Sequence, residues 1–348
     1  MKINNAASWA ILLSFVVGVL YMGRSIILPF VIALLVWFVV KKVGDLLDKV
    51  RFVHTYIPRW FKTLMASALI FFILGLSGKM LTANLEDLSG SYENYAKNVE
   101  DIAGKMNSAL DIDGTFNVDV QKELNTVLSP DFITPFLNSI FQSISEILGS
   151  LLMIFFYTLF LFIEEGLFQK KMHLIFNSKD QYKNFINTMK KIEKMLSRYI
   201  ALKSLVNLSS ACLAFVLMWL VGIDSPFFWA ALIFFFSFIP VIGPILATLF
   251  ASVFSLLQFG DFVPFLIILC GVTTIQLIIG NYVEPRLMGN TLNISPIVAI
   301  LSLAVWGALW GITGMLLSVP ISVAIIIILS QFDGTRPVAI LLSERGRL

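Results

Sequence analysis

The sequence predicts an all-α polytopic membrane protein with about eight apolar segments. Of its 348 residues, 58% are hydrophobic and only 14% are charged, whereas a soluble domain carries roughly a quarter charged residues. A helix needs about 20 mostly apolar residues to span a bilayer, and several segments meet that requirement. The sequence lacks the alternation of lipid-facing and lumen-facing residues that marks outer-membrane barrels, so the spans are expected to be helices.

Residues 1–81 are predicted to hold the N-terminal transmembrane helices. Lys2 and the apolar run 6–22 could be mistaken for a secretion signal, but no small-residue cleavage site follows and a second apolar run, 26–40, begins at once. We therefore expect an uncleaved first span that forms a hairpin with the second. A third span, 63–81, then leaves the cytoplasm, and a fourth, within 147–168, returns to it.

Charge is distributed unevenly among the connecting segments, and it predicts the orientation. Residues 164–203 carry nine basic and four acidic side chains, and residues 41–62 are also mainly basic. Residues 82–148 instead hold eleven acidic and three basic side chains. Because lysine and arginine remain on the cytoplasmic side, the basic segments should face inward and 82–146 should form an acidic extracytoplasmic insertion. Both termini are then cytoplasmic.

The acidic insertion has an apolar repeat of seven residues, which is typical of a helix that packs along a narrow seam. Self-association through this seam and packing on the protein's own outer surface both fit the pattern, and both remain open. The break DIDG, at 111–114, is expected to end the helix, and a shorter helix is expected at 117–128. The residues assigned to self-association are Leu85, Leu88, Tyr92, Tyr95, Val99 and Ile102.

A basic amphipathic helix is predicted within 169–203, leading into the fifth span. Such a helix is attracted to anionic lipid, which is the simplest partner for this surface. Its apolar side chains recur at helical spacing between lysines, and they are Tyr182, Phe185, Met189, Ile192, Leu196 and Tyr199.

Two apolar segments of the C-terminal transport region, 204–331, are too long for straight spans. As helices, 227–257 and 294–329 would extend about 45–55 Å, whereas the hydrocarbon core is about 30 Å thick. Each segment holds helix breakers near its middle, so each should bend or fold back there. The breakers are Pro240, Gly243 and Pro244 in the first segment and Gly311, Gly314 and Pro320 in the second.

The arginines of the tail, 332–348, limit the choice between bent spans and re-entrant hairpins. The tail is cytoplasmic if both segments cross once or if both fold back, but not if only one does. Structural kinks explain a single break, whereas two similar breaks favour a pair of irregular segments around a polar cavity, as in transporters with internal repeats. We expect the two breaks to approach each other near the middle of the membrane and to be the moving parts.

A polar stretch, GNYVEPRLMGN at 280–290, follows the seventh apolar run. With Gln276 it gathers Asn281, Glu284 and Arg286, and Pro285 is expected to keep Glu284 out of a helical conformation. It is either a connecting loop with an exposed ion pair or one wall of a substrate path.

Other chemistry is not predicted. Cys212 and Cys270 lie in apolar segments and are expected to be small buried hydrophobes, while His54 and His173 stand apart in basic loops. The sequence contains neither a metal-ligand cluster nor a phosphate-binding glycine loop. We therefore expect no cofactor, no metal, no enzymatic activity and no nucleic-acid partner.

The stretches SFIPVIGPILAT, GNYVEPRLMGNTLNISPIV and WGITGMLLSVPISV resemble the autoinducer-2 exporter family of bacterial inner-membrane proteins. The likeness covers most of the chain and is greatest to the branch named for exporting the quorum-sensing signal autoinducer-2. It implies a secondary transporter that forms homo-oligomers, with pentamers one such state. Many family members have an acidic residue where this chain has Ile278 and Ile279, so Glu284 is the carboxylate nearest these motifs.

Three functions follow as hypotheses. The first is export of a small, polar, uncharged signal molecule along a path that includes Pro240, Gly243, Pro244, Gln276, Asn281, Glu284, Arg286, Gly314 and Pro320. The second is exchange of sodium or lithium for protons, as the resemblance also implies, with Glu284 as the titrating group. The third is an oligomeric scaffold that assembles through the extracytoplasmic helix.

Overall fold

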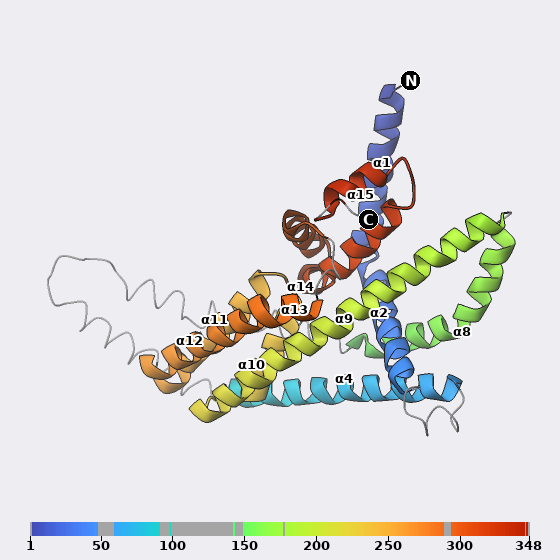
Figure 1. The fold of residues 1–348 in the computed structure, drawn as a ribbon. Coiled ribbons are helices and arrows are strands. Elements are labelled where there is room, and N and C mark those ends of the chain that lie inside the picture. The colour runs from blue at the N-terminus through green and yellow to red at the C-terminus, as the bar shows by residue number, and fades with distance from the viewer. Residues whose placement is uncertain are drawn as a thin grey trace. The chain divides into compact units, whose positions relative to one another are not determined.

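The computed structural model describes residues 2–47, 59–90, 98, 142, 149–176, 178–288, 294–344 and 346. Their secondary structure is helical (Figure 1). The helices are α1 (Lys2–Met22), α2 (Arg24–Leu47), α4 (Arg59–Gly90), α8 (Leu151–Ile175), α9 (Lys179–Val221), α10 (Pro226–Phe236), α11 (Ile242–Phe259), α12 (Phe262–Ile278), the π-helix η1 (Ile279–Val283), α13 (Glu284–Met288), α14 (Pro296–Leu329) and α15 (Arg336–Leu342).

The predicted fold class is confirmed. Seven of the described helices are long and apolar enough to cross a membrane, and α10 is a shorter apolar helix. The chain divides into two compact units, and α4 and α9 contribute residues to both. The first unit comprises Met1–Leu74, Gly149–Ala201 and Asn290–Leu348, and the second comprises Gly75–Leu148 and Leu202–Gly289.

In the first unit, α2 and α8 pack side by side and run in the same direction. The Phe30 ring lies 5.7 Å from that of Tyr157, and the Trp37 ring lies 6.1 Å from that of Phe162, so both sequence numbers rise together along the contact. At the end of this contact Lys41 Nζ lies 2.7 Å from a carboxylate oxygen of Glu165 on α8 and 2.7 Å from one of Glu193 on α9. One lysine therefore joins three helices of this unit.

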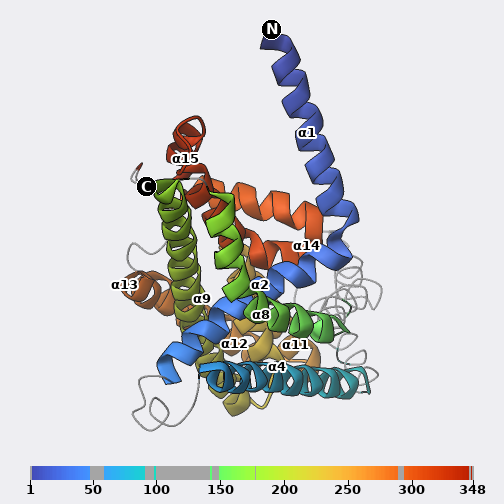
Figure 2. The ribbon, with the colours of Figure 1, turned by 90° about the vertical axis from the view of Figure 1, so that its right-hand side faces the viewer.

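The expected hairpin between the first two spans is wrong. α1 and α2 are separated only by Gly23, whose N–H donates to the Val19 carbonyl and whose carbonyl accepts from the Ile27 N–H, as in a continuing helix. The two helices diverge from this joint instead of lying antiparallel (Figures 1 and 2). The reason is the short connection, because one residue that keeps helical hydrogen bonds does not reverse the chain.

The second long segment, α14, is a helical hairpin. Its helical backbone is interrupted at Trp310 and Gly311, and Gly311 has φ 63° and ψ −145°, a conformation essentially restricted to glycine. The two arms lie against each other, since the Ser322 hydroxyl donates to the Ser302 hydroxyl at 2.7 Å. A Cβ on Gly314 would lie 1.9 Å from the Trp306 carbonyl oxygen, so only glycine fits this contact.

The break in α14 thus lies at 310–311, and the expectation that Pro320 takes part in it is wrong. Pro320 is buried within the second arm, and the helix continues through it to Leu329. Membrane helices tolerate an internal proline when neighbouring groups accommodate the freed backbone. Glycine at a positive φ angle, rather than proline, reverses the chain here.

In the second unit, α10 and α11 form the first hairpin. Its turn includes Val241, whose φ of 62° is unusual for a β-branched residue, and such strain clusters at functional sites. The Trp229 and Phe254 rings stack across the two arms with centroids 4.7 Å apart. A Cβ on Gly243 would lie 1.7 Å from the Phe236 carbonyl oxygen. With 11 residues, α10 extends only about 16 Å and is too short to cross the hydrocarbon core.

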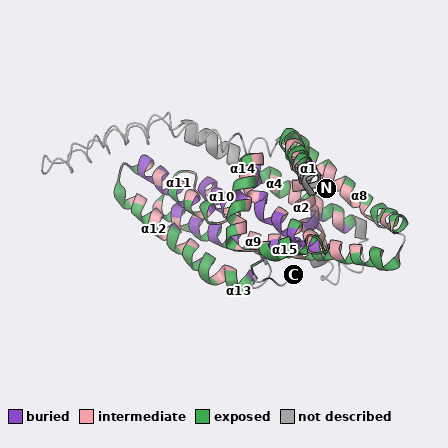
Figure 3. Ribbon diagram, turned by 90° about the horizontal axis from the view of Figure 1, so that it is seen from above, coloured by how far each residue is buried: buried purple, intermediate pink, exposed green. Residues whose placement is uncertain are grey.

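Both long segments therefore fold back, which is one of the two alternatives that the charge of the tail allows. In each hairpin the backbones approach at a glycine, and many of the positions on α10 and α11 are buried (Figure 3). After the first hairpin, Gly260 ends α11 with φ 63°, and the Asp261 carboxylate accepts from the Val263 N–H to begin α12.

The apolar stripe predicted within 169–203 lies on the first half of α9, which begins at Lys179, whereas residues 169–175 belong to α8. Along the predicted stripe, Ile192, Leu196 and Tyr199 are buried, whereas Lys190 and Lys194 on the same helix are exposed. This helix continues without a break into the fifth apolar run, so that the basic and apolar halves of α9 form one helix of 43 residues.

Most of the predicted extracytoplasmic insertion lies outside the described residues, including Tyr92, Tyr95, Val99 and Ile102 of the seam, the DIDG break and the helix expected at 117–128. Leu85 and Leu88 belong to α4, which continues from the third span to Gly90. Asn98 donates to the carbonyls of Leu257 and Gln258 at 3.0 and 2.7 Å, where the last turn of α11 leaves carbonyls without helical partners.

The prediction that the cysteines are buried is wrong, because Cys212 and Cys270 are both exposed on the surface of their helices. Apolar sequence around a residue does not distinguish the packed face of a membrane helix from the face that lipid covers.

Replacement of Gly243 by alanine should disrupt the first hairpin. The added Cβ would overlap the Phe236 carbonyl, so the backbone must move and the free energy of unfolding should fall by about 3 kcal/mol or more. Thermal unfolding of the purified protein measures this loss. Gly280→Ala is the control, since a Cβ there meets no atom within 4 Å, and it should change stability by about 1 kcal/mol or less. Equal stability of Gly243→Ala and wild type would contradict the close approach.

Candidate functional site

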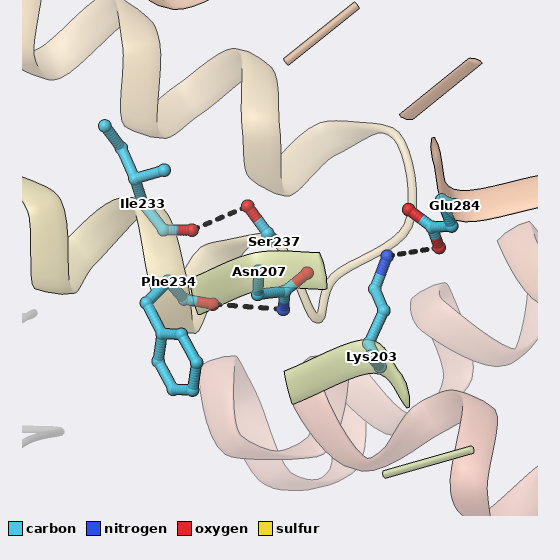
Figure 4. A network of polar contacts seen from close by, with 6 residues as sticks. All are labelled: Lys203, Asn207, Ile233, Phe234, Ser237 and Glu284. Atoms are coloured by element: carbon cyan, nitrogen blue, oxygen red, sulfur yellow. Dashed lines mark hydrogen bonds and ion pairs between the residues drawn. The ribbon is translucent and has the colours of Figure 1, made fainter. Parts of the chain in front are cut away.

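A polar cluster surrounds the break of the first hairpin within the second unit. It consists of Lys203 and Asn207 on α9, Ser237 in the turn and Glu284 at the start of α13 (Figure 4). Lys203 and Asn207 are four residues apart, so they share one face of α9. We call this group the α9–hairpin cluster.

Lys203 and Glu284 form an ion pair with 2.6 Å between Nζ and Oε1. Their side chains are 13% and 27% exposed, respectively, so both charges are largely removed from solvent. A charge-assisted hydrogen bond of this length is stronger than one between neutral groups. Glu284 therefore does not form the exposed ion pair of a connecting loop, and Arg286 lies exposed two residues further along the chain.

The π-helix η1 precedes Glu284. Its wider turn is closed by the Glu284 N–H, which donates to the Ile279 carbonyl five residues earlier. Glu284 has φ −59° and ψ −50°, so the expectation that Pro285 keeps it out of a helical conformation is wrong. Pro285 lies at the beginning of α13, where a helix tolerates the missing N–H.

Asn207 and Ser237 satisfy carbonyl groups near the break. Asn207 is 1% exposed, and its Nδ2 donates to the Phe234 carbonyl at 3.2 Å. The Ser237 hydroxyl donates to the Ile233 carbonyl at 2.6 Å, and this carbonyl also accepts the ordinary helical bond from the Ser237 N–H, so of the two only the Phe234 carbonyl depends on a side chain. The last carbonyls of a helix have no helical partner, and leaving one buried without a hydrogen bond is costly. The protein itself therefore satisfies part of the backbone that the break exposes.

The three residues predicted at the first break lie together in the turn and the first turn of α11. Pro240 and Pro244 are half-buried, and Gly243 is buried against Phe236 and Ile239. Because Pro244 lies in the first turn, where no helical partner is lost, replacement of the prolines by alanine would not restore one continuous helix. Gly243 and the positive φ angle at Val241 would still reverse the chain.

The remaining predicted path residues differ in their surroundings. Gln276 has a buried Nε2 with no hydrogen-bond partner in the described part of the chain, and its place on a substrate path stays a prediction. Asn281 on η1 is exposed and donates to the Leu277 carbonyl at the end of α12 at 3.0 Å. Gly314 and Pro320 belong to the first unit, and the approach of the two breaks stays a prediction.

Sequence reasoning missed the roles of Lys203 and Asn207. Lys203 counted only as one of the basic residues before the fifth span. The available signal was its position, since Lys203 and Asn207 are polar residues one helical turn apart at the start of an apolar run.

Apolar spanning helices, two re-entrant hairpins and a buried polar cluster define a multi-pass membrane protein of the transporter class. The model of the family described as "AI-2E family transporter" matches residues 10–334. The chain therefore belongs to the AI-2E transporter family.

Three bacterial relatives illustrate the likeness. A putative transport protein of Borreliella burgdorferi is 35% identical over 223 residues. The match covers 63% of this chain and 60% of that protein, so the chain spans less than two thirds of this relative. The AI-2 transport protein TqsA of Escherichia coli K12 is 26% identical over 331 residues, 93% of this chain and 91% of TqsA. A putative transport protein of Haemophilus influenzae is 25% identical over 337 residues, which cover 93% of this chain and 91% of that protein.

Reversal of one charge in the Lys203–Glu284 pair should destabilise the protein. Either Lys203→Glu or Glu284→Lys places like charges together in a largely buried position, at a cost of about 1–3 kcal/mol. The double variant restores opposite charges and should recover most of that loss, which a double-mutant cycle of unfolding measures as a coupling energy.

The control for this cycle is the exposed pair of Lys171 and Glu164 on α8. Lys171→Glu should change stability by less than about 1 kcal/mol, because solvent screens the charges. A coupling energy near zero between positions 203 and 284 would contradict the structural role of the buried pair.

Proposed function

We propose that this protein is a secondary transporter that exports a small, polar, uncharged signal molecule, autoinducer-2, across the bacterial inner membrane. Membership of the AI-2E transporter family supports transport, and the likeness to the AI-2 transport protein TqsA supports the choice of cargo. The first hairpin supports a path for a polar solute, because irregular backbone at membrane depth persists only when it is buried in protein or lines a wet cavity.

The Lys203–Glu284 pair is the single observation that favours an uncharged cargo. The two opposite charges compensate each other at 2.6 Å, so the α9–hairpin cluster carries no net charge. Its amide and hydroxyl groups can exchange hydrogen bonds with a hydroxyl-bearing solute. A charged cargo would instead need a compensating charge within the protein.

The orientation that we propose places the C-terminus in the cytoplasm, whereas the cytoplasmic N-terminus that the sequence predicts would need the α1–α2 hairpin that the structure replaces with a continuing helix. The basic half of α9 faces the cytoplasm, the insertion 82–146 lies outside, and the tail 332–348 returns inside. The first hairpin then enters the membrane from the extracytoplasmic side and the second from the cytoplasmic side. Lys203 then lies at the cytoplasmic end of the apolar half of α9, in ion-pair contact with Glu284 at the start of α13, while Asn98 meets α11 at the extracytoplasmic end.

Exchange of sodium or lithium for protons is the competing function. It would need a carboxylate that binds the cation, and Glu284 is the candidate among these motifs. The Lys203 ammonium already occupies the position beside this carboxylate, which favours the neutral exporter. An oligomeric scaffold would explain the seam of the insertion but would leave the polar cluster without a role.

The partners that we propose are a small polar solute, membrane lipid along the basic face of α9, and further copies of the same chain. A homo-oligomer, with a pentamer as one such assembly, would be held by the seam that begins with Leu85 and Leu88. The heptad spacing supports this assembly, because a narrow apolar stripe suits a helix–helix contact.

Inverted membrane vesicles that contain the protein should accumulate autoinducer-2 faster than vesicles without it. Gly243→Ala should reduce this uptake at least about tenfold in vesicles matched for inserted protein, and Gly280→Ala should retain it. Equal uptake in vesicles with and without the protein would contradict the proposed cargo.

Sodium and lithium distinguish the competing function in the same vesicles. After a proton gradient has been formed, addition of either cation should not dissipate it, because the Lys203–Glu284 pair leaves no free carboxylate in this cluster. Cation-dependent proton movement that disappears in Glu284→Gln would instead establish exchange and contradict the neutral exporter.

A further inference from the structure

The first hairpin holds three deeply buried polar atoms that have no hydrogen-bond partner in the described part of the chain. They are Nε1 of Trp229 on α10 and the hydroxyl oxygens of Thr248 and Ser255 on α11. The three residues are 3%, 4% and 0% exposed. Buried polar groups in native proteins are nearly always paired, so this concentration within one hairpin calls for an explanation.

The two hydroxyl residues lie on the same face of α11. Thr248 and Ser255 are seven residues apart, or about two helical turns, which places them one above the other at a separation of about 10 Å. Trp229 stacks on Phe254, the neighbour of Ser255, so the indole belongs to the same end of the hairpin as the Ser255 hydroxyl. These groups form a polar track along the hairpin.

Other serine and threonine hydroxyl groups nearby do form a hydrogen bond to a carbonyl of their own helix. Ser252 on the same helix donates to the Thr248 carbonyl at 2.7 Å, and Thr274 on α12 donates to the Cys270 carbonyl at 2.7 Å. Thr248 and Ser255 do not make the equivalent bond to their own helix. Their hydroxyl groups thus have no hydrogen-bond partner within the described part of the chain.

We propose that Trp229, Thr248 and Ser255 form a binding site for an uncharged solute with several hydroxyl groups. The indole N–H donates a hydrogen bond to the solute, and each side-chain hydroxyl both donates and accepts one. The site contains no ionisable group, so it suits a neutral polyol rather than a cation or a carboxylate. This inference rests on the proposed function and extends the path from the α9–hairpin cluster along the hairpin.

Polar groups that bind a solute, and are unpaired without it, lower the stability of the solute-free protein. If the two hydroxyl groups are unpaired in the solute-free protein, their replacement by apolar groups of similar shape relieves a desolvation cost. Thr248→Val together with Ser255→Ala should therefore raise the unfolding temperature of the solute-free protein by about 2–4 °C. A merely structural role would give the opposite sign.

Solute binding tests the same variant independently of transport. Ribose and erythritol should raise the unfolding temperature of the purified wild-type protein, whereas sodium chloride at the same concentration should not. In the double variant the concentration of polyol that gives half of this shift should rise about tenfold, because two hydrogen bonds to the solute are lost. Trp229→Phe should have a smaller effect in the same direction.

Ser252→Ala is the matched control, because its hydroxyl lies on the same helix but is already bonded within the protein. It should keep the polyol response of the wild type. A lower unfolding temperature of the solute-free double variant, or an unchanged polyol response in it, would overturn this inference. One outcome separates the two proposals. If vesicles with the wild-type protein transport the signal, but polyols raise the unfolding temperature of the double variant as much as that of the wild type, the proposed function stands and only this site fails. If the wild type neither binds polyols nor transports the signal, both fail.

Discussion

Close approach of backbone to backbone at two glycines is the contact on which both hairpins depend. At Gly243 and Gly314 an added Cβ would lie 1.7 and 1.9 Å from a carbonyl oxygen of the opposite arm. Hydrocarbon offers no hydrogen bonds to a reversed chain, so the two arms must pack closely next to the turn, although Val241 in the turn itself is 65% exposed. Only glycine brings the two arms near enough for that, and this explains why a turn replaces a simple kink in both segments.

The polar cluster follows from the same requirement. A helix that ends within the membrane leaves carbonyl groups unpaired, and Asn207 provides a donor for the Phe234 carbonyl in the last turn of α10. The Ser237 hydroxyl adds a second donor to the Ile233 carbonyl, which already accepts from the Ser237 N–H. Lys203 is one turn before Asn207 on α9, and its ion pair with Glu284 brings the end of η1 to this helix. The groups that stabilise the break and those that we propose for a solute therefore belong to the same unit.

Much of this architecture could be predicted from the sequence, because the length of an apolar segment and the charge of its flanking residues limit how many times the segment can cross the membrane. The excess length of 227–257 and 294–329 and the arginines of the tail left two alternatives, and the hairpins are one of them. The Lys203–Glu284 pair could not be predicted, since its partners are 81 residues apart and meet only through tertiary packing. Pro320 was misassigned because proline marks a break less reliably in a packed membrane helix than Gly311 does.

The most direct test of this account is the side of the membrane on which the two ends of the first hairpin emerge. Asp224 and Asp261 are exposed at those ends, and each can be replaced by cysteine after Cys212 and Cys270 have been changed to alanine. A membrane-impermeant thiol reagent should label both positions in intact cells, whereas Lys183→Cys in the basic half of α9 should react only after permeabilisation. Labelling of one end from outside and of the other only after permeabilisation would mean that the segment crosses the membrane, and it would contradict the re-entrant hairpin.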